Sequence, residues 1–203
     1  SINYDINGNL ITSYKSLSLR NVFDEDRIRD KYGRDLYYMR KDLTSTSTKN
    51  AVVFLNGEYW GFYLIQEKVD NDFISNNYLL PSKNISMIKS NKLQEGPQVE
   101  LDNFKYFCGN YTLKDVTDKK IYSEIKEYID INSLIELYAT GIYISNLDWP
   151  SNNDGEWKYL GKPIEGNKYS DGKWRFMIFD LDYSMGANFF NNLNSPDKNS
   201  FEF

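Results

Sequence analysis

Two short segments carry the carboxylate and amide side chains best suited to chemistry in this sequence. Asp148 and Asn153 stand five residues apart in NLDWPSNND, and Asp180 and Asp182 close the run WRFMIFDLD. Their oxygens are hard ligands of the kind that magnesium prefers, and an ionised carboxylate can also accept a hydroxyl proton. These residue types suit phosphoryl transfer, in which metal ions neutralise developing charge, or glycoside hydrolysis, which uses a pair of carboxylates.

The composition removes several other reaction classes. The 203 residues include no histidine and a single cysteine, Cys108. A Ser-His-Asp or Cys-His hydrolase therefore cannot be built, and most catalytic zinc sites lack their usual ligand. We expect Cys108 to be a small, partly buried apolar residue. The net charge is −5 with scattered basic residues, and no apolar run is long enough to span a bilayer, so we expect neither a nucleic acid nor a membrane as partner.

The apolar pattern predicts the elements that position the two segments. A helix from about Asp130 to Ser145, with Asp130 as its cap, leads into a loop at 146–154. The apolar run before Asp180 predicts a buried strand that delivers Asp180 and Asp182 to one sheet edge.

Spacing alone is weak evidence for a catalytic pair. Asp72 and Asn77 show the same interval within a segment that reads as a helix. From composition alone, Asp148 and Asn153 are as readily explained as turn residues, and Asp180 as an acid that ends a strand.

The rest of the chain predicts more strand in its first half and more helix in its second, which gives an α+β fold class. In chain order, the pattern predicts a strand at 16–19, a helix at 24–40 interrupted at Gly33, a loop at 44–50, a hairpin of 51–55 and 59–67 around Asn56-Gly57, a helix at 70–79, a strand at 84–90, a polar stretch at 94–102 and a helix at 118–128.

Five blocks of sequence, in this order, resemble the CotH family of atypical protein kinases. They are SLSLRN at 16–21, FLNGEYWGFYLIQEKVDNDFI at 54–74, NISMIKS at 84–90, NLDWPSNN at 146–153 and KWRFMIFDLDYSMG at 173–186. The resemblance implies a kinase-like fold in a single domain over 1–203, with a sheet-rich lobe over 1–100 and a helical lobe over 101–203. Because the family continues with further helical sequence, it also implies that the chain is truncated at its C-terminus.

The resemblance also implies an activity and a setting. Members of the family use ATP and Mg²⁺ or Mn²⁺ to phosphorylate serines of spore coat proteins, and relatives occur in other secreted bacterial proteins. A coat or surface protein would then be the substrate, and the compartment would be the spore coat or the extracellular surface. The sequence itself leaves the oligomeric state open.

Site roles follow from the same resemblance by position. Asp148 looks like the catalytic-loop aspartate, Asn153 like a metal-binding amide and Asp180 like the metal-binding aspartate at the strand end. Asp182 is a rival for that last role, because alternation along a strand would send it to the same face.

Three further residues are similar to family positions around the nucleotide. Lys89 would contact phosphates. Glu67 could pair with Lys89 as the lysine-glutamate pair does in ordinary kinases, with Lys68 as a competing partner. Arg20 could reach phosphate, clamp the lobes or form a structural ion pair. The chain departs from ordinary kinases in having no G-x-G-x-x-G loop, and Asn146 stands where their catalytic loop has histidine.

The sequence also fits three other functions. A catalytically inactive kinase-like scaffold fits the same motifs. A carbohydrate-binding or surface module is suggested by the 17 tyrosines and 4 tryptophans, although cross-strand packing would account for most hairpin aromatics. A two-carboxylate glycosidase accounts for neither Asn153 nor Lys89.

Overall fold

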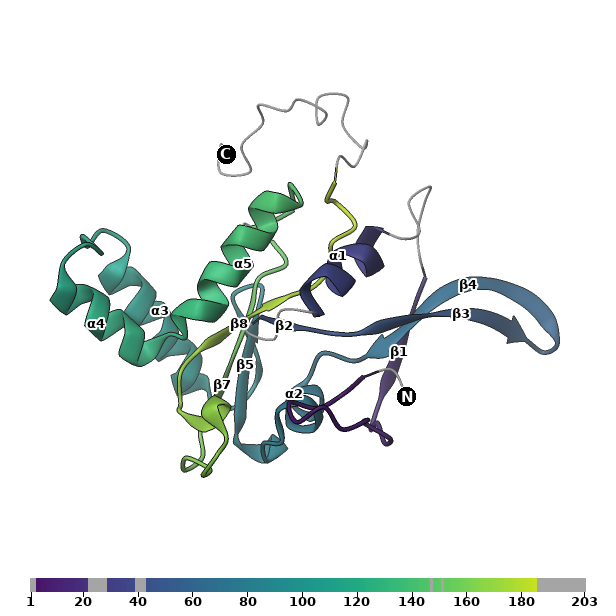
Figure 1. Cartoon of the computed structure of the whole chain (residues 1–203), viewed down its shortest axis with the longest axis horizontal. Helices are drawn as coiled ribbons and strands as arrows, with labels where there is room; N and C mark the ends of the chain where they lie inside the picture. Colours follow the sequence, from purple (N-terminus) through teal and green to yellow (C-terminus); the bar gives the residue numbers. More distant parts are fainter. Residues whose placement is uncertain (1–2, 22–28, 39–42, 147, 151, 186–203) are drawn as a thin grey trace.

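A computed structural model describes residues 3–21, 29–38, 43–146, 148–150 and 152–185 (Figure 1). This part of the chain forms two β-sheets, five α-helices and two short 3-10 turns at Ser82–Asn84 and Lys168–Ser170. The α+β class predicted from the sequence is therefore confirmed. None of the helices in these ranges is long and apolar enough to cross a membrane.

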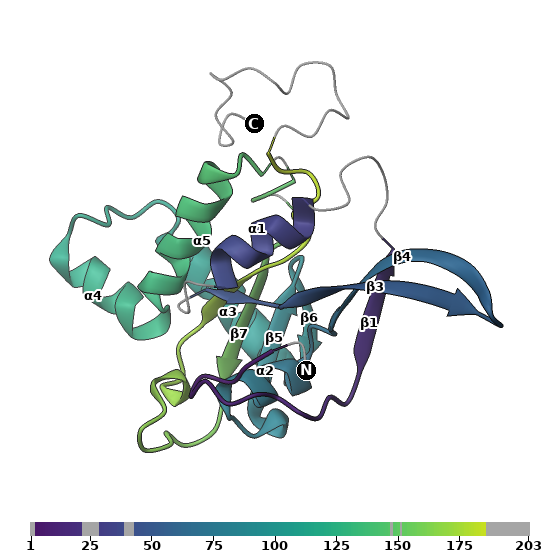
Figure 2. The same cartoon turned by 45° about the vertical axis from the view of Figure 1, so that its right-hand side comes forward.

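The first sheet has three antiparallel strands in the order β1-β4-β3, namely β1 (Leu17–Asn21), β3 (Thr48–Leu55) and β4 (Glu58–Glu67). The predicted hairpin turn is confirmed, since Asn56 and Gly57 take φ angles of 52° and 86°. Figure 2 shows the β3-β4 hairpin extending beyond the body of the molecule. Tyr59 and Trp60 near its tip are each more than 60% exposed. They are therefore less buried than expected for aromatic side chains that pack across the strands.

The second sheet has five strands in the order β2-β8-β7-β5-β6. They are β2 (Thr44–Ser45), β5 (Ile85–Lys89), β6 (Lys92–Glu95), β7 (Gly155–Tyr159) and β8 (Arg175–Ile178). The buried strand predicted before Asp180 is confirmed, because every residue of β8 is buried. Strands from both sides of residue 100 share this sheet. The division into two lobes at that position stays a prediction.

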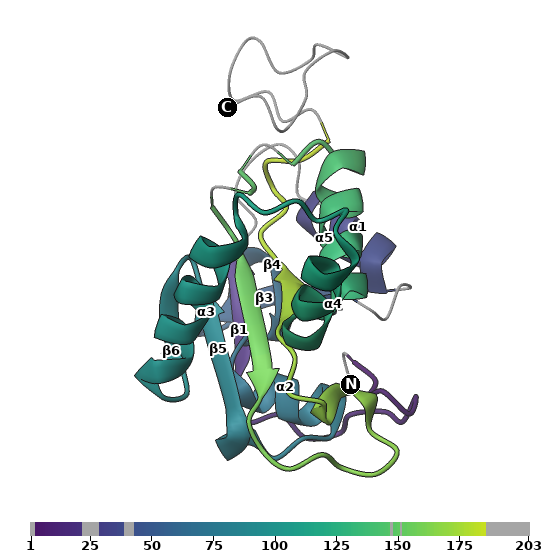
Figure 3. The same cartoon turned by 90° about the vertical axis from the view of Figure 1, so that its left-hand side faces the viewer.

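Helices cover both faces of the five-stranded sheet, with α3, α4 and α5 on the side that Figure 3 brings into view. The helices are α1 (Arg29–Tyr38), α2 (Asn71–Tyr78), α3 (Gln98–Tyr111), α4 (Lys119–Tyr128) and α5 (Ile131–Tyr143). Successive strand residues point to opposite faces. Accordingly, Met87 and Trp157 pack with α2 in one core cluster, whereas Phe176 and Ile178 pack with α5 and α1 in another.

The predicted loop at 44–50 is wrong, because both β2 and the start of β3 lie there. Its polar composition is misleading. The Thr44 hydroxyl is buried, where it bonds the hydroxyl of Tyr78 at 2.7 Å and accepts a hydrogen bond from Nε1 of Trp157 at 2.8 Å. A polar residue whose hydrogen bonds are satisfied can occupy a core strand.

Helix α1 runs without interruption through Gly33, contrary to the prediction, while residues 24–28 and 39–40 of that predicted helix lie outside the described ranges. The sequence also missed α3, β6 and β7. Helix α3 was hard to see because Leu101 is its only buried residue, so its apolar periodicity is weak. Cys108, on the same helix, is exposed rather than partly buried.

Candidate functional site

One edge of the five-stranded sheet collects most of the predicted site residues. Gly155 begins β7 and pairs with Met177 near the end of β8, and Lys89 at the end of β5 pairs with the same glycine. The segments on either side, ending with Asn153 and beginning with Asp180, therefore leave the sheet at the same edge. The register thus places Lys89, the loop before β7 and the segment after β8 side by side.

The loop before β7 holds Asp148 in a small network of amides. Nδ2 of Asn153 donates to Oδ2 of Asp148 at 2.7 Å, and Nδ2 of Asn152 donates to both carboxylate oxygens at 3.1 Å. Oδ1 of the buried Asn146 accepts a hydrogen bond from the backbone N–H of Asp148 at 3.3 Å. The predicted pair of Asp148 and Asn153 is therefore in direct contact.

Helix α5 anchors this loop through a tryptophan. Trp149 is 3% exposed and packs against Gly141, where an added Cβ would collide with the indole ring. Asp130 caps the start of the same helix as predicted, because its carboxylate accepts from the N–H groups of Asn132 and Ser133. The capped helix and its glycine thus fix the position of the residue next to Asp148.

Asp180 and Asp182 share one cationic partner, Arg20 of β1. The guanidinium contacts Oδ1 of Asp180 and lies 3.3 Å from Oδ2 of Asp182. Burial lowers the pKa of Arg20, but the hydrogen bond to Asp180 and the charges of the surrounding aspartates outweigh burial, and the pKa is raised overall. Burial and the charge of Asp180 raise the pKa of Asp182. The structural ion pair, one of the three roles considered for Arg20, is therefore present.

Asp180 is the more constrained of the two carboxylates. Its φ angle is 61°, in the left-handed region that non-glycine residues enter uncommonly. Strained backbone of this kind persists only where neighbouring groups hold it, and it is frequent at functional sites. The backbone conformation therefore distinguishes Asp180 from Asp182.

Lys89 brings an ammonium group to the same edge. Its Nζ lies 4.6 Å from the ring centroid of Phe179, and no ion pair joins it to any described residue. Burial lowers its pKa, and the charge of Asp180 partly opposes that effect. A half-buried ammonium next to an acidic segment is available to an anionic ligand.

Glu67 does not pair with Lys89, and that prediction is wrong. Its carboxylate accepts hydrogen bonds from Nδ2 of Asn3 at 2.8 Å and from Nδ2 of Asn77 at 3.0 Å, and burial raises its pKa. The competing pair with Lys68 is also absent, because Lys68 lies 3.7 Å from Asp70.

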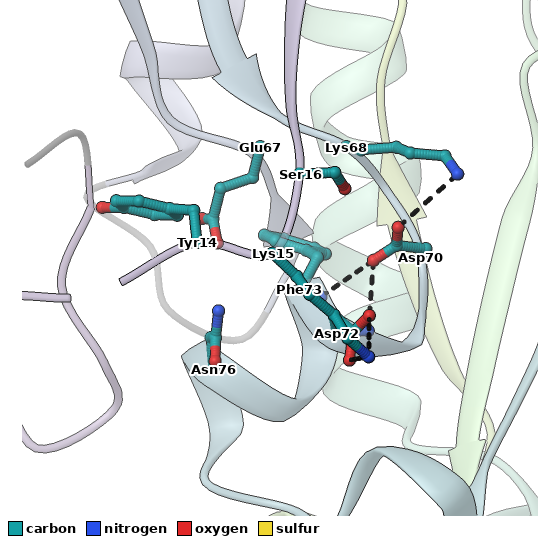
Figure 4. Close-up of a pocket in the computed structure, with 9 residues that line it drawn as sticks. All are labelled: Tyr14, Lys15, Ser16, Glu67, Lys68, Asp70, Asp72, Phe73 and Asn76. Carbon is teal, nitrogen blue, oxygen red and sulfur yellow. Dashed lines mark hydrogen bonds and ion pairs between the residues drawn. The ribbon is translucent and has the colours of Figure 1, made fainter. Parts of the chain in front are cut away.

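Strand register explains the position of Glu67. Glu67 pairs with Leu17 on β1, three residues before Arg20, so alternation along β1 sends Glu67 and Arg20 to opposite faces of the sheet. Figure 4 shows Glu67 in a small pocket beside Tyr14 and the first turn of α2. Glu67 is therefore separate from the sheet edge that holds Lys89.

The model of the CotH kinase protein family matches residues 2–200, almost the whole chain. The chain belongs to the CotH kinase family. No curated protein matches it. Membership confirms the resemblance predicted from the five sequence blocks, and it indicates kinase-like phosphoryl transfer as the chemistry of the family.

A CotH kinase is expected to use a nucleotide and a metal ion, and the donor chemistry at the sheet edge fits a hard cation. Asn153, Asp180 and Asp182 supply amide and carboxylate oxygens. Over the described ranges, however, no group of three or more acidic, histidine or cysteine side chains is arranged to hold a metal. Instead, Arg20 provides the positive charge beside Asp180 and Asp182, so these residues fit a metal ion in kind but are paired with a guanidinium here.

Two residues beside the candidate site were not found from the sequence. Oδ1 of Asp30, on α1, accepts a hydrogen bond from the backbone N–H of Leu181 at 2.8 Å and another from Nε of Arg34 at 3.0 Å. In the sequence, Asp30 and Arg34 read as an ordinary i, i+4 surface pair. Only their burial, at 6% and 1% exposure, distinguishes them.

Proposed function

We propose that this chain binds ATP with Mg²⁺ or Mn²⁺ and transfers the terminal phosphoryl group to a serine or threonine hydroxyl of a protein. One observation carries the proposal. Asn153, Asp180, Asp148 and Lys89 belong to segments that meet at the same edge of the sheet, and Lys89 forms no ion pair with any described residue. In a member of the CotH kinase family, this set matches what phosphoryl transfer requires.

Each side chain has a role that its contacts support. Two amide donors orient the Asp148 carboxylate, which would accept the proton of the attacking hydroxyl. Lys89 would contact phosphate oxygens, because its ammonium group forms no ion pair within the part of the chain that the structure describes. Asp180 and Asn153 would hold the divalent ion, with Asp182 next to them. When bound, the ion would supply positive charge that stabilises the transferring phosphoryl group.

Arg20 would change partners during this cycle. In the structure, its guanidinium pairs with Asp180 and Asp182. If these carboxylates held a divalent ion, the guanidinium would be released to contact a phosphate, which accepts well-aligned N–H donors. Phosphate contact and the ion pair, two of the roles considered for Arg20, would then be successive states of one residue.

The proposal is tested by nucleotide binding and phosphoryl transfer with matched variants. Calorimetry would measure binding of a non-hydrolysable ATP analogue with and without Mg²⁺, and transfer of labelled phosphate to casein would measure activity. We expect Asp180→Asn to lose metal-dependent binding. We expect Asp148→Asn to keep binding and lose transfer by about 10²- to 10⁴-fold. Asp102→Asn, on the exposed face of α3, is the control.

A non-transferring scaffold is the second candidate, and the Arg20 contacts favour it. If the Arg20 guanidinium stays paired with Asp180 and Asp182, it would permanently exclude a metal ion from these two carboxylates. The two functions give different results. A scaffold would bind nucleotide without transfer in the wild type, and binding would not require Mg²⁺. Binding of an oligosaccharide without any nucleotide binding would instead favour the surface-module alternative.

A further inference from the structure

Helix α1 makes three contacts with the segment Asp180–Asp182, and none of them has a role in the mechanism above. Asp30 accepts from the N–H of Leu181, the residue between the two aspartates, at 2.8 Å. Nη1 of Arg29 donates to the carbonyl oxygen of Asp182 at 3.1 Å. The helix therefore holds the backbone of this segment on both sides of Leu181.

The third contact is packing between Leu181 and a glycine of the helix. Leu181 is fully buried, and a Cβ added to Gly33 would lie 2.7 Å from its Cδ1. Arg29, Asp30 and Gly33 share one side of α1, because residues three and four apart are neighbours on a helix. The glycine thus lets the segment approach the helix closely enough for the hydrogen bond to Asp30.

Asp30 is itself held in place from the first sheet. Arg34 is 1% exposed and bonds Oδ1 of Asp30, the hydroxyl of Thr46 and, at 3.0 Å, the side-chain oxygen of Gln66 on β4. The other oxygen of Asp30 is buried without a hydrogen bond and lies 3.8 Å from Nη1 of Arg20. A buried carboxylate with two arginines beside it has little freedom to move.

These contacts explain how the left-handed backbone of Asp180 is maintained. A φ of 61° costs free energy for a residue with a Cβ atom. The hydrogen bond from Leu181 to Asp30 acts on the very next peptide unit, so it opposes relaxation of Asp180 to an ordinary backbone conformation. Removing the acceptor would leave a buried N–H unsatisfied and release this constraint.

We propose that Asp30 is a positioning residue, which fixes the backbone of Asp180–Asp182 through Leu181 and so sets the direction in which Asp180 is presented to the metal ion. The proposal rests on the proposed function. The inference extends the proposed function, because it gives a positioning role to a residue of α1, a helix that contacts neither nucleotide nor metal in the mechanism above. Substitution of a residue that hydrogen-bonds the segment carrying a metal ligand typically weakens metal affinity about 10- to 100-fold.

The test compares Asp30→Ala with Asp35→Ala, which removes an exposed carboxylate from the same helix. The two measurements are calorimetric affinity for Mn²⁺ with a non-hydrolysable ATP analogue and hydrogen exchange of the Leu181 amide by NMR. For Asp30→Ala we expect roughly 10- to 100-fold weaker metal-nucleotide binding and faster exchange at Leu181. Asp35→Ala should change neither. Asp30→Asn retains an acceptor oxygen and should recover part of the affinity.

Gly33→Ala keeps the test decisive if Asp30→Ala fails to fold. Alanine favours a helix over glycine by about 1 kcal/mol, so α1 itself should gain stability. The new methyl group would nevertheless push Leu181 away from Asp30, so we expect faster exchange of the Leu181 amide together with weaker metal-nucleotide binding. Faster exchange with unchanged binding would overturn the inference.

Three results would overturn the inference or separate it from the proposed function. Unchanged metal affinity in Asp30→Ala would overturn it, even if the Leu181 amide exchanges faster. Equal losses in Asp30→Ala and Asp35→Ala would also overturn it. If the wild type binds no metal nucleotide, the proposed function fails. Exchange at Leu181 then decides alone whether Asp30 fixes this backbone.

Discussion

Replacing Arg20 with alanine tests whether its guanidinium stands in for a metal ion. The substitution leaves Asp180 and Asp182 side by side without their shared cation. Charges 3.3 Å apart, as between Arg20 and Asp182, attract by about 5 kcal/mol at an effective dielectric constant of about 20 and by about 1 kcal/mol in water. The three side chains are 29% to 46% exposed. Solvent screening and side-chain ordering therefore reduce the expected loss of unfolding free energy to about 1–2 kcal/mol.

The same substitution should strengthen the binding of free Mg²⁺. On the proposed function, Mg²⁺ would have to displace the guanidinium from Asp180 in the wild type but not in Arg20→Ala. If displacing the guanidinium costs about 1.4 kcal/mol, the Mg²⁺ affinity of Arg20→Ala should be about tenfold higher than that of the wild type. At a saturating concentration, Mg²⁺ should then stabilise the variant by about 1.4 kcal/mol more than it stabilises the wild type. Urea unfolding at pH 7 with and without Mg²⁺ measures both effects.

The pH dependence gives the same prediction an independent check. Burial and the charge of Asp180 already raise the pKa of Asp182, and loss of Arg20 should raise it further. A carboxyl whose folded pKa lies above its unfolded value loses stabilising free energy as pH rises through the interval between the two. The difference between Arg20→Ala and wild type should therefore be small near pH 3 and grow as pH rises.

The control is Lys15→Ala, which breaks an ion pair with Asp72 at 3.0 Å in which the lysine is 74% exposed. Its effect should stay below about 1 kcal/mol and should not respond to Mg²⁺. The reasoning is refuted if Mg²⁺ stabilises Arg20→Ala no more than it stabilises the wild type.

Three further substitutions probe the site and its supports. Burial and the charge of Asp154 raise the pKa of Glu156 from 4.5 to about 8, so wild-type stability should fall as pH rises between these values, by up to about 5 kcal/mol. Glu156→Gln should abolish that fall in urea unfolding. Gly141→Ala should displace Trp149, cost about 1–3 kcal/mol in thermal unfolding and reduce phosphoryl transfer. Lys89→Met should weaken nucleotide binding about tenfold in calorimetry, because the phosphate loses its ammonium partner. The free energy of unfolding should not fall, because the substitution removes a half-buried charge.

Each of these has a contrary outcome. A Glu156→Gln variant that follows the wild-type pH profile would mean that Glu156 ionises normally. Gly109→Ala on α3, where an added Cβ meets nothing within 4 Å, is the control for Gly141→Ala and should be neutral or stabilising. Equal effects of the two alanine substitutions would argue against the Trp149 anchor. Unchanged nucleotide affinity in Lys89→Met would remove Lys89 from the site.

Local signals in the sequence were sufficient for several elements. Asn56-Gly57 specifies its own turn, because both residues accept left-handed angles. Asp130 could be identified as a cap because the helix behind it has a strong apolar pattern. The segment before Asp180 could be identified as a buried strand for a similar reason. Where a feature depends on a few neighbouring residues, the sequence predicted it.

Features that depend on distant contacts were missed or wrong. Nothing local to Glu67 reveals that Asn3, far away in the chain, bonds its carboxylate. The i, i+4 spacing of Asp30 and Arg34 is typical of a solvent-exposed helix face. Their burial depends on distant segments, because Asp30 bonds Leu181 and Arg34 bonds Thr46 and Gln66. The approach of Arg20 to Asp180 likewise depends on how the two sheets are arranged.

The position of a bound metal nucleotide tests the central claim most directly. Manganese is paramagnetic and broadens the NMR signals of nearby nuclei. On addition of Mn²⁺ with a non-hydrolysable ATP analogue, we expect the signals of the Asn153 side-chain amide and the Leu181 backbone amide to broaden first, while that of Gly109 on α3 persists. Broadening that spares Asn153 and Leu181 while affecting another surface would contradict the assignment of this sheet edge as the site of phosphoryl transfer.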